Sequence, residues 1–462
     1  MRQRRITIGE KRDRYIEAPR SQPLHQEPTM AFDDFQPDPR ITKAHFLKDG
    51  QGGDQRNSGW QANNNVALHR VLGNPTTFPS DAFCARSFIL KVVIAPDSFK
   101  ESLSAELAAA AIARGVRQVL PDARIFCIPM ADGGEGTLDA LLSATHGDRK
   151  SCRVRGASGE DQEASWGLIG NTAVIEVAAA AGLALIPPSQ RRPMNACSFG
   201  VGQLIKAALD AHADRIILGL GGSSTNDGGA GMLAALGVRF LDAKGSQLPP
   251  GGAALKTLAK LDTSDLDPRL ALVKIEVASD VDNPLCGNSG ASHVFGPQKG
   301  ATLDQVRELD LSLENLANVC ASHFGTDQRD CAGAGAAGGL GFAAMTFLRA
   351  SFRPGVEIVA EICGLEAEIG DADLVFTGEG RMDAQTLHGK TPAGVARIAQ
   401  RAGVPVIALA GALGEGYDAL YACGVSAAFS LVSGPMTLDA ACEHAEALLT
   451  DRARDATRLW SI

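Results

Sequence analysis

Residues 215–232 read RIILGLGGSSTNDGGAGM, a short apolar run followed by a loop of glycine and hydroxyl residues. The run 215–220 predicts a buried strand, and residues 228–236 predict the helix that follows it. The same order of strand, loop and helix recurs before and after this stretch. Strands that alternate with helices predict a mostly parallel sheet with helices on both faces. We therefore expect an α/β fold.

The predicted elements cover most of the chain after residue 90. Further strands are expected at residues 91–96, 124–130, 172–177, 274–279, 373–377 and 405–410. Further helices are expected at residues 104–120, 136–145, 200–211, 303–324, 338–348, 391–402 and 438–460. Open parallel sheets bind ligands beyond the carboxyl ends of their strands, so we look for a site there.

Composition excludes several classes of protein. The chain has 462 residues, 45% hydrophobic and 21% charged, as expected for a globular protein of two to four domains. Its formal net charge of −9 argues against a nucleic-acid binder. The longest apolar stretch, 173–186, contains Glu176, so no membrane span is predicted. Ten cysteines without a CxxC pair indicate reduced thiols in a cytoplasmic protein, and we expect a core position for Cys127, Cys320, Cys363 and Cys442.

Residues 1–89 differ from the rest of the chain. They are polar, lack helical or alternating periodicity, and are predicted to be disordered. No apolar segment follows the basic residues 1–14, so a secretory signal is not expected. A transit peptide is disfavoured by acidic residues in the same region. A further hypothesis is that translation starts at Leu90, which would place this segment outside the native protein.

Glycine- and aspartate-rich segments lie at the ends of five predicted strands. They span residues 97–100, 131–137, 221–229, 280–284 and 378–383, and Gly389-Lys390-Thr391 opens the following helix. Backbone N–H groups in such turns, together with helix N-termini, bind phosphate. Phosphoryl transfer also needs cations, metal ligands and a base for the attacking hydroxyl.

Each segment also has a simpler interpretation. Gly221-Gly222 could be only a tight turn, Asp227 a helix cap, and Lys390 a solvated helix residue. Five such segments at equivalent strand ends favour a shared site. His388 is more readily a loop residue than a base. The GxGxxG match at 333–338 does not follow a strand, so we expect its glycines to allow close packing and not NAD binding.

The chain from Lys91 to Arg454 resembles the bacterial type I glycerate kinases, the glycerate 2-kinase family. The resemblance rests on KVVIAPDSFKESLSA (91–105), ADGGEGT (131–137), GLGGSSTNDGGAGM (219–232), ASDVDNPLCG (278–287), VFGPQKGA (294–301), GAGAAGGLG (333–341) and LVFTGEGRMDAQTLHGKTPAGVA (374–396). It implies ATP-dependent phosphorylation of D-glycerate to 2-phosphoglycerate, with Mg²⁺. It also implies a flavodoxin-like α/β domain formed by residues 90–154 and 356–462, with a second α/β domain inserted at 155–355 and the active site between them.

We assign roles from the chemistry of each residue. Asp280 is the predicted base, with Asp282 or Asp227 as alternatives. Arg381 is predicted to bind the substrate carboxylate, and Lys100 is the second choice. Further substrate contacts are predicted for Asp97, Ser98, Asp132, Asp282 and Asn283. The ATP phosphates are placed against Gly221, Gly222, Ser223, Ser224, Thr225, Asn226, Asp227, Gly378, Glu379, Gly380 and Lys390. Glu135 and Asp383 are the predicted metal ligands.

Other functions stay open at this point. A kinase for a related small hydroxy acid would use the same site, and spacing alone does not separate 2- from 3-phosphorylation. A metabolite sensor or a dehydrogenase fits less well, because the loop carboxylates are present and the GxGxxG context is wrong. We expect a cytoplasmic enzyme with D-glycerate as its partner, without nucleic acid or membrane. A homodimer is left open.

Overall fold

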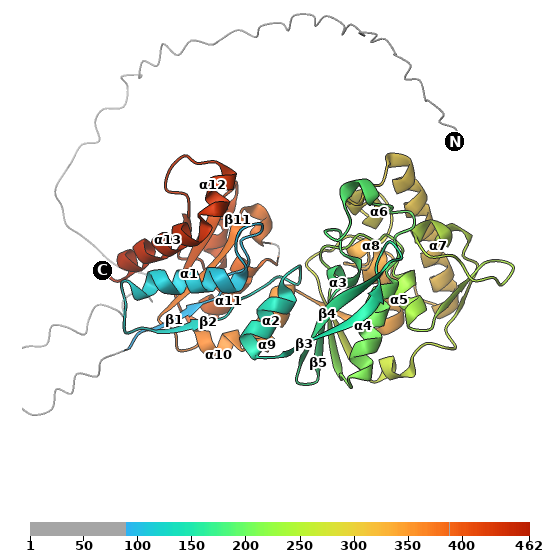
Figure 1. Cartoon of the computed structure of the whole chain (residues 1–462), viewed down its shortest axis with the longest axis horizontal. Coiled ribbons are helices and arrows are strands. Elements are labelled where there is room, and N and C mark those ends of the chain that lie inside the picture. The colour runs from blue at the N-terminus through green and yellow to red at the C-terminus, as the bar shows by residue number, and fades with distance from the viewer. Residues whose placement is uncertain (1–88, 388) are drawn as a thin grey trace, which may run out of the picture. The chain divides into compact units, whose positions relative to one another are not determined.

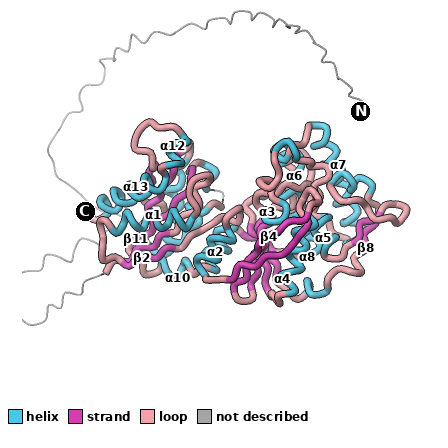
Figure 2. Tube along the Cα trace, in the orientation of Figure 1, coloured by secondary structure: helices cyan, strands magenta, loops and turns pink. Residues whose placement is uncertain are grey.

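Two β-sheets organise the part of the chain that the computed structural model describes, residues 89–387 and 389–462 (Figures 1 and 2). The prediction of disorder for residues 1–89 falls almost entirely outside this part, as does His388. These described residues belong to one compact unit by their contacts. The α/β prediction is confirmed.

The first sheet has five parallel strands in the order β13-β12-β11-β1-β2. Two strands come from the beginning of the described chain and three from its end. Counted along the chain, this is the order 2-1-3-4-5 of flavodoxin-like sheets, whose ligands bind where strand order reverses, beside β1. The strands are β1 (Lys91–Ile94), β2 (Arg124–Cys127), β11 (Leu374–Met382), β12 (Val406–Leu413) and β13 (Ala427–Ser430).

Helices cover both faces of this sheet. One face packs on α1 (Ala105–Arg117) and α13 (Ala445–Trp460), and Ser104 caps α1 through its side chain. The other face packs mainly on α9 (Gly355–Ile362) and α11 (Thr391–Ala402). Three more helices belong to this region: α2 (Thr137–Thr145), α10 (Leu365–Ile369) and α12 (Leu438–Glu443).

The second sheet has six strands in the order β10-β9-β6-β5-β4-β3. The first four are parallel, and β3 and β4 are antiparallel. The strands are β3 (Asp148–Arg155), β4 (Asp161–Ile169), β5 (Thr172–Glu176), β6 (Arg215–Gly219), β9 (Lys274–Ala278) and β10 (Ser351–Arg353). A separate pair consists of β7 (Arg239–Leu241) and β8 (Lys260–Asp262).

Helices between these strands complete a second core. They are α3 (Val177–Ala181), α4 (Phe199–Asp210), α5 (Ala230–Ala235), α6 (Ala291–Phe295), α7 (Leu303–Phe324) and α8 (Ala336–Leu348). Residues Val174, Ile217 and Ala278 of the second sheet pack in the same cluster as α2 and α9. The two sheets therefore share a core through these helices. None of the helices in the described ranges is both long and apolar enough to cross a membrane.

The structure corrects several sequence predictions. The antiparallel hairpin β3–β4 was not predicted, because its alternation of polar and apolar residues is weak. Since β3 begins at Asp148, the six-stranded sheet starts before the predicted boundary at residue 155. The predicted helix 438–460 is interrupted at His444. Among the four cysteines expected in the core, only Cys320 is buried, and Cys127 is exposed.

The glycines of the GxGxxG match allow close packing, as predicted. A Cβ atom at Gly335 would lie 2.2 Å from the Pro284 carbonyl oxygen, and one at Gly338 would lie 2.0 Å from the Thr225 carbonyl oxygen. Gly338 also has a φ of +69°, which favours glycine. The start of α8 thus presses against the loops that follow β6 and β9.

Candidate active site

Four carboxylates gather where strands of the two sheets end. Asp97 follows β1, Asp280 follows β9, Glu379 lies in β11, and Asp132 lies in the loop before α2. Burial raises the pKa of each of the other three carboxyls, and the negative charge of Asp132 adds to the shift in all three. We call Asp97, Asp132, Asp280 and Glu379 the acidic centre. It lies beside β1, where the strand order of the first sheet reverses.

Asp97 is held in place by short local bonds. Its carboxylate accepts hydrogen bonds from the Ser98 backbone N–H at 2.6 Å and from Thr391 Oγ1 at 2.6 Å. Thr391 is fully buried at the start of α11. Burial, followed by the charge of Asp132, raises the pKa of Asp97 to about 7, although these two hydrogen bonds oppose the shift. The group can therefore exchange a proton near neutral pH.

Asp280 lies directly against the loop that opens α11. A Cβ atom at Gly389 would lie 2.5 Å from Asp280 Oδ1, so only glycine fits here. Burial of the carboxyl, followed by the charge of Asp132, raises the pKa of Asp280 to about 7. The residue as a whole remains exposed, so water screens part of this effect. Asp280 combines access from solvent with a pKa suited to a general base.

Glycine packing brings the acidic centre together. A Cβ atom at Gly133 would lie 2.9 Å from the Ala278 Cβ atom, at the end of β9. One at Gly355 would lie 1.9 Å from the Asp132 carbonyl oxygen. One at Gly221 would lie 2.7 Å from the Gly134 Cα atom. The loop 131–137 thus fits between segments of the second sheet that larger residues would push away.

Cations border the acidic centre at Glu379. Lys390 Nζ lies 3.7 Å from Glu379 Oε2, and the charges of Lys390 and Lys100 both lower the pKa of Glu379 against the effect of its burial. Arg381 is different: its side chain is 69% exposed and its Nε donates to Asp383 Oδ2 at 3.1 Å. Lys100 and Lys390 are therefore close to the centre, whereas Arg381 lies at its solvent side.

The segment Gly378–Gly380 is strand and not loop. It continues β11, and Gly378 and Glu379 pair with Leu409 and Ala410 of β12. A Cβ atom at Gly378 would lie 2.3 Å from the Leu409 carbonyl oxygen. The sequence prediction of a loop here is wrong, because backbone groups of this segment take part in a sheet ladder, whereas the predicted ATP contact of Gly378, Glu379 and Gly380 stays a prediction. The glycines allow close approach of neighbouring chain segments.

The loop after β6 is divided between surface and interior. Gly222 is exposed and has a φ of +69°, as a tight glycine turn requires. Residues 223–227 are buried. The Asp227 carboxylate accepts hydrogen bonds from Ser198 N at 2.8 Å, Ser198 Oγ at 2.9 Å and the N–H groups of Gly229 and Gly231. Asp227 therefore supports the start of α5, and this carboxylate is closed to ATP and to a substrate hydroxyl.

The remaining predicted residues lie around this region. Asp282 is exposed, and Asn283 donates to the Ser289 carbonyl oxygen at 2.8 Å. Glu135 is exposed, and Asp383 is engaged with Arg381 and the Gln385 N–H. Across residues 89–387 and 389–462, no three His, Cys, Asp or Glu side chains are grouped as a preformed metal site. The predicted pair Glu135 and Asp383 is thus not part of such a group.

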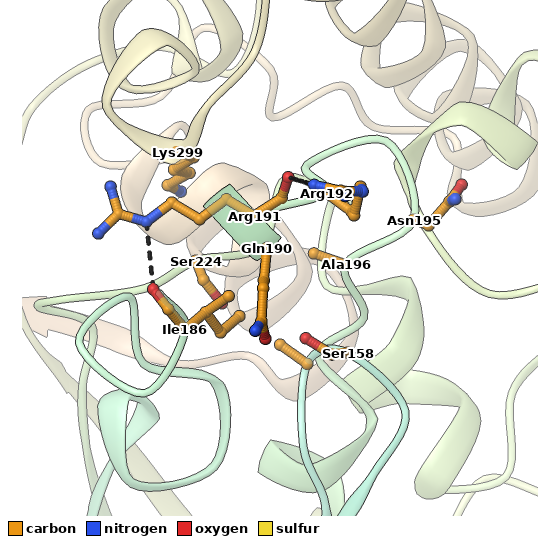
Figure 3. Close-up of a pocket in the computed structure, with 10 residues that line it drawn as sticks. Ser158, Ile186, Gln190, Arg191, Arg192, Asn195, Ala196, Ser224 and Lys299 are labelled. Carbon is orange, nitrogen blue, oxygen red and sulfur yellow. Dashed lines mark hydrogen bonds between the residues drawn. The ribbon is translucent and has the colours of Figure 1, made fainter. Parts of the chain in front are cut away.

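A second feature was missed by sequence reasoning. Lys299 is 2% exposed and donates to Ser223 Oγ at 3.1 Å and to the Thr225 carbonyl oxygen at 2.7 Å. It lines a cavity of about 190 Å³ with Arg191 and Ser224 (Figure 3). The sequence signal was its place in the motif VFGPQKGA (294–301), to which no role was assigned.

A wider hollow of about 770 Å³ lies along α9, α10 and α11. Its lining includes Gly389, the neighbour of Asp280, and the charged residues Glu357 and Arg397. The hollow thus extends to Gly389, but none of the four carboxylates of the acidic centre lines it.

Comparison with known proteins identifies the family of this chain. The model of the glycerate kinase family matches residues 92–461. The chain belongs to the glycerate kinase family. It is 52% identical over 368 residues to a glycerate kinase of Bacillus subtilis, covering 79% of this chain and 96% of the relative. It is 49% identical over 354 residues to the glycerate 2-kinase of Escherichia coli, covering 76% and 93%.

A solved glycerate kinase structure has the same fold. The crystal structure titled as glycerate kinase 2 from Salmonella typhimurium aligns with a TM-score of 0.74 at 49% identity, covering 80% of this chain and 98% of that chain. The glycerate kinase match begins at Val92, next to the start of β1. The family resemblance predicted from the sequence is confirmed.

Proposed function

We propose that the protein transfers the terminal phosphoryl group of ATP to the 2-hydroxyl of D-glycerate. The observation that carries this proposal is the acidic centre with two lysines beside it, in a chain of the glycerate kinase family. Carboxyls with a raised pKa can accept a hydroxyl proton, and cations can stabilise the phosphoryl group in transfer. The 2-position follows the glycerate 2-kinase relative.

Asp280 is the proposed base. It is accessible from solvent, whereas Asp97 is 8% exposed and already bound by Ser98 and Thr391. Asp132 raises the pKa of Asp280, and Gly389 allows the chain to pass close to its carboxylate. Asp97, Ser98, Asp132, Asp282 and Asn283 remain the proposed substrate contacts.

ATP is proposed to approach with its phosphates near Gly221, Gly222, Lys100 and Lys390. Arg381 lies at the solvent side of the same edge and remains the proposed partner of the substrate carboxylate. Mg²⁺ is proposed as the metal that neutralises the phosphates. It usually keeps several waters and binds one or two carboxylates plus phosphate oxygens. Within the described residues neither the acidic centre nor Glu135 and Asp383 belong to a group of three metal-binding side chains, so the metal would be held by one or two carboxylates together with the phosphates.

The domain division is also a proposal. We infer two domains: one built on the five-stranded sheet, from residues 90–154 and 356–462, and one inserted at 155–355. The start of β3 at Asp148 supports moving the first boundary a few residues earlier. A cytoplasmic location and a homodimer are part of the same proposal, and neither bears on the chemistry above.

Phosphorus NMR of the product tests the reaction. The full chain is supplied with D-glycerate, ATP and Mg²⁺, and we expect 2-phosphoglycerate. A 3-phosphoglycerate signal would retain the kinase and overturn the position of transfer. If ATP is consumed only with another small hydroxy acid, the assignment of D-glycerate as the substrate is wrong.

A matched pair of variants tests the base. Asp280→Asn should lower turnover by about 10²–10⁴-fold with the fold intact, because it removes the proton acceptor. Asp282→Asn, two residues away and a proposed substrate contact, should raise KM for D-glycerate but leave kcat nearly unchanged. The reverse result would identify Asp282 as the base.

A further inference from the structure

The cavity beside Lys299 is lined by cationic and neutral side chains only. Its ten lining residues include Arg191, Arg192 and Lys299, and none of the ten is Asp or Glu. They come from four separate segments of the chain, as Figure 3 shows. The cavity is therefore electropositive, although the chain as a whole has a net charge of −9.

The three cations lack an acidic partner. Within the described part of the chain, none of them lies in an ion pair; Arg191 donates to the carbonyl oxygens of Ile186 at 3.4 Å and Gln298 at 3.0 Å. Arg192 donates to the carbonyl oxygens of Ser189 and its neighbour Arg191. Carbonyl groups orient a guanidinium but do not neutralise it.

Lys299 is the most constrained of the three. Two of its three possible N–H donors are used, by Ser223 Oγ and the Thr225 carbonyl oxygen. Burial lowers its pKa to about 7, and the charge of Asp227 opposes this shift only in part. The Asp227 carboxylate is already bound to Ser198 and to backbone N–H groups. A buried ammonium of this kind is costly unless an anion accompanies it.

Two further polar atoms beside Lys299 have unused bonding capacity. Thr225 Oγ1 and Asn226 Oδ1 are buried and have no hydrogen-bond partner in the described residues. Both belong to the segment whose backbone binds Lys299. Neither residue lines the cavity, so these atoms show only that the loop behind Lys299 has unused bonding capacity, and the case for an anion rests on the three cations.

We propose that this cavity binds a small oxyanion of the reaction, with Lys299 and Arg191 as its cationic partners. The volume of about 190 Å³ suits a carboxylate or one phosphoryl group and is too small for a whole nucleotide. The same loop joins this cavity to the acidic centre, since Gly221 packs on Gly134, two residues from Asp132. The proposal rests on the proposed function, because it takes the oxyanion from D-glycerate or from ATP. Lys299 and Arg191 would then replace Arg381 as the partners of the carboxylate, or bind one ATP phosphate in addition to Lys100 and Lys390.

Binding and kinetics of three variants test the proposal. We compare Lys299→Met, Arg191→Gln and the control Lys260→Met, whose lysine is exposed on β8 away from the lining residues. Calorimetry gives Kd for D-glycerate and for Mg-ATP, each in the absence of the other substrate, and initial rates give KM for each substrate. Losing a charge-assisted hydrogen bond should weaken binding of one substrate about 10–100-fold.

The affected substrate identifies the source of the oxyanion. A rise in Kd and KM for D-glycerate alone supports a carboxylate, and a rise for ATP alone supports a phosphoryl group. Unchanged constants for both substrates in folded variants would overturn the proposal. Because Lys299→Met removes a buried group, its thermal unfolding is measured first, and Arg191→Gln decides the question if that variant does not fold. Wild-type protein that forms no phosphoglycerate would instead count against the proposed function.

Discussion

At the scale of single residues, Asp132 controls the protonation of its neighbours. It raises the pKa of Asp97 and Asp280, each to about 7, after the larger contribution of burial. Because these carboxyls interact, the pH dependence they produce belongs to the group and not to one residue. Below pH 7 they hold their protons and cannot accept one from a hydroxyl.

The first prediction concerns this pH dependence. With Mg-ATP saturating, kcat/KM for D-glycerate should fall as the pH drops below about 7. Asp132→Asn removes a negative charge, which should lower the pKa of both carboxyls and move the acidic limb to lower pH. The midpoint of the limb is measured, since the absolute rate also reflects substrate contacts of Asp132. Asp282→Asn should leave the midpoint in place, and an unmoved midpoint in Asp132→Asn would contradict the charge coupling.

At the scale of elements, the loop that opens α11 sets the position of Asp280. Gly389 has a φ of +91°, and its missing side chain leaves the space that Asp280 Oδ1 occupies. Thr391, two residues later, binds Asp97 from the same helix. One helix N-terminus therefore positions carboxylates that come from both sheets.

The second prediction is that Gly389→Ala disables the site without unfolding the protein. The new Cβ atom would displace the Asp280 carboxylate, and a displacement near 1 Å can lower turnover about 10²-fold. Gly403→Ala is the matched control, because Gly403 ends the same helix with a φ of +72° and no atom within 4 Å of the added Cβ. Both variants should lose about 1–2 kcal/mol of stability from backbone strain, and only Gly389→Ala should lose activity. Kinetics and thermal unfolding of both variants check this.

A buried charge network joins three strands of the second sheet. Glu276 on β9 accepts from Arg215 on β6 at 2.5 Å and from Arg353 on β10 at 3.1 Å, and Lys274 Nζ lies 3.0 Å from it. Burial alone would raise the pKa of Glu276, but hydrogen bonds from these three cations lower it to about 2. The network thus stabilises the fold at every pH at which Glu276 is ionised.

The third prediction is that Glu276→Gln lowers the free energy of unfolding by roughly 3 kcal/mol near neutral pH. Because the folded pKa is depressed, the contribution is present above the unfolded value of about 4.5 and is lost as the pH falls toward 2. Denaturant unfolding of both proteins at several pH values should show the difference shrink over that range. Glu308→Gln, which removes an exposed pair with Lys256, should cost less than about 1 kcal/mol.

At the scale of the whole molecule, the family match and the two sheets occupy the same part of the chain. The match spans residues 92–461, and the described elements run from β1 to the end of α13. Both sheets contribute residues to the acidic centre, so the site forms only when both sheets are folded. Residues 1–89 lie outside the match.

The fourth prediction is that residues 1–89 are dispensable for catalysis. A chain starting with Met in place of Leu90 should fold and have a kcat and KM within about twofold of the full chain, because no predicted site residue precedes Asp97. Activity of purified proteins and their thermal unfolding check this. A folded short chain without activity would show that the extension takes part in function.

The amino-acid sequence was enough to predict the α/β class, most of the central strands and the family. Buried parallel strands have continuous apolar runs, and glycine-rich motifs such as 131–137 and 219–232 are long enough to be specific. The start of α1 also follows the sequence, since a helix was predicted from residue 104 and Ser104 caps it. The hairpin β3–β4 was missed because β3 is largely polar and exposed and β4 begins with polar residues, so they lack the apolar pattern of a buried strand.

The three-dimensional fold was needed to see which polar residues lie close together and which are enclosed in the protein interior. Asp227 and Asp280 both follow strands of one sheet, yet Asp227 is enclosed by backbone donors and Asp280 is open to solvent. Gly378–Gly380 has the composition of a turn but extends β11, because β12 lies beside it to pair with. Lys299 is buried and bound by the Ser223 hydroxyl and the Thr225 carbonyl oxygen only because distant segments of the chain fold around it. Sequence specifies side-chain chemistry, whereas burial, partners and pKa depend on residues far away along the chain.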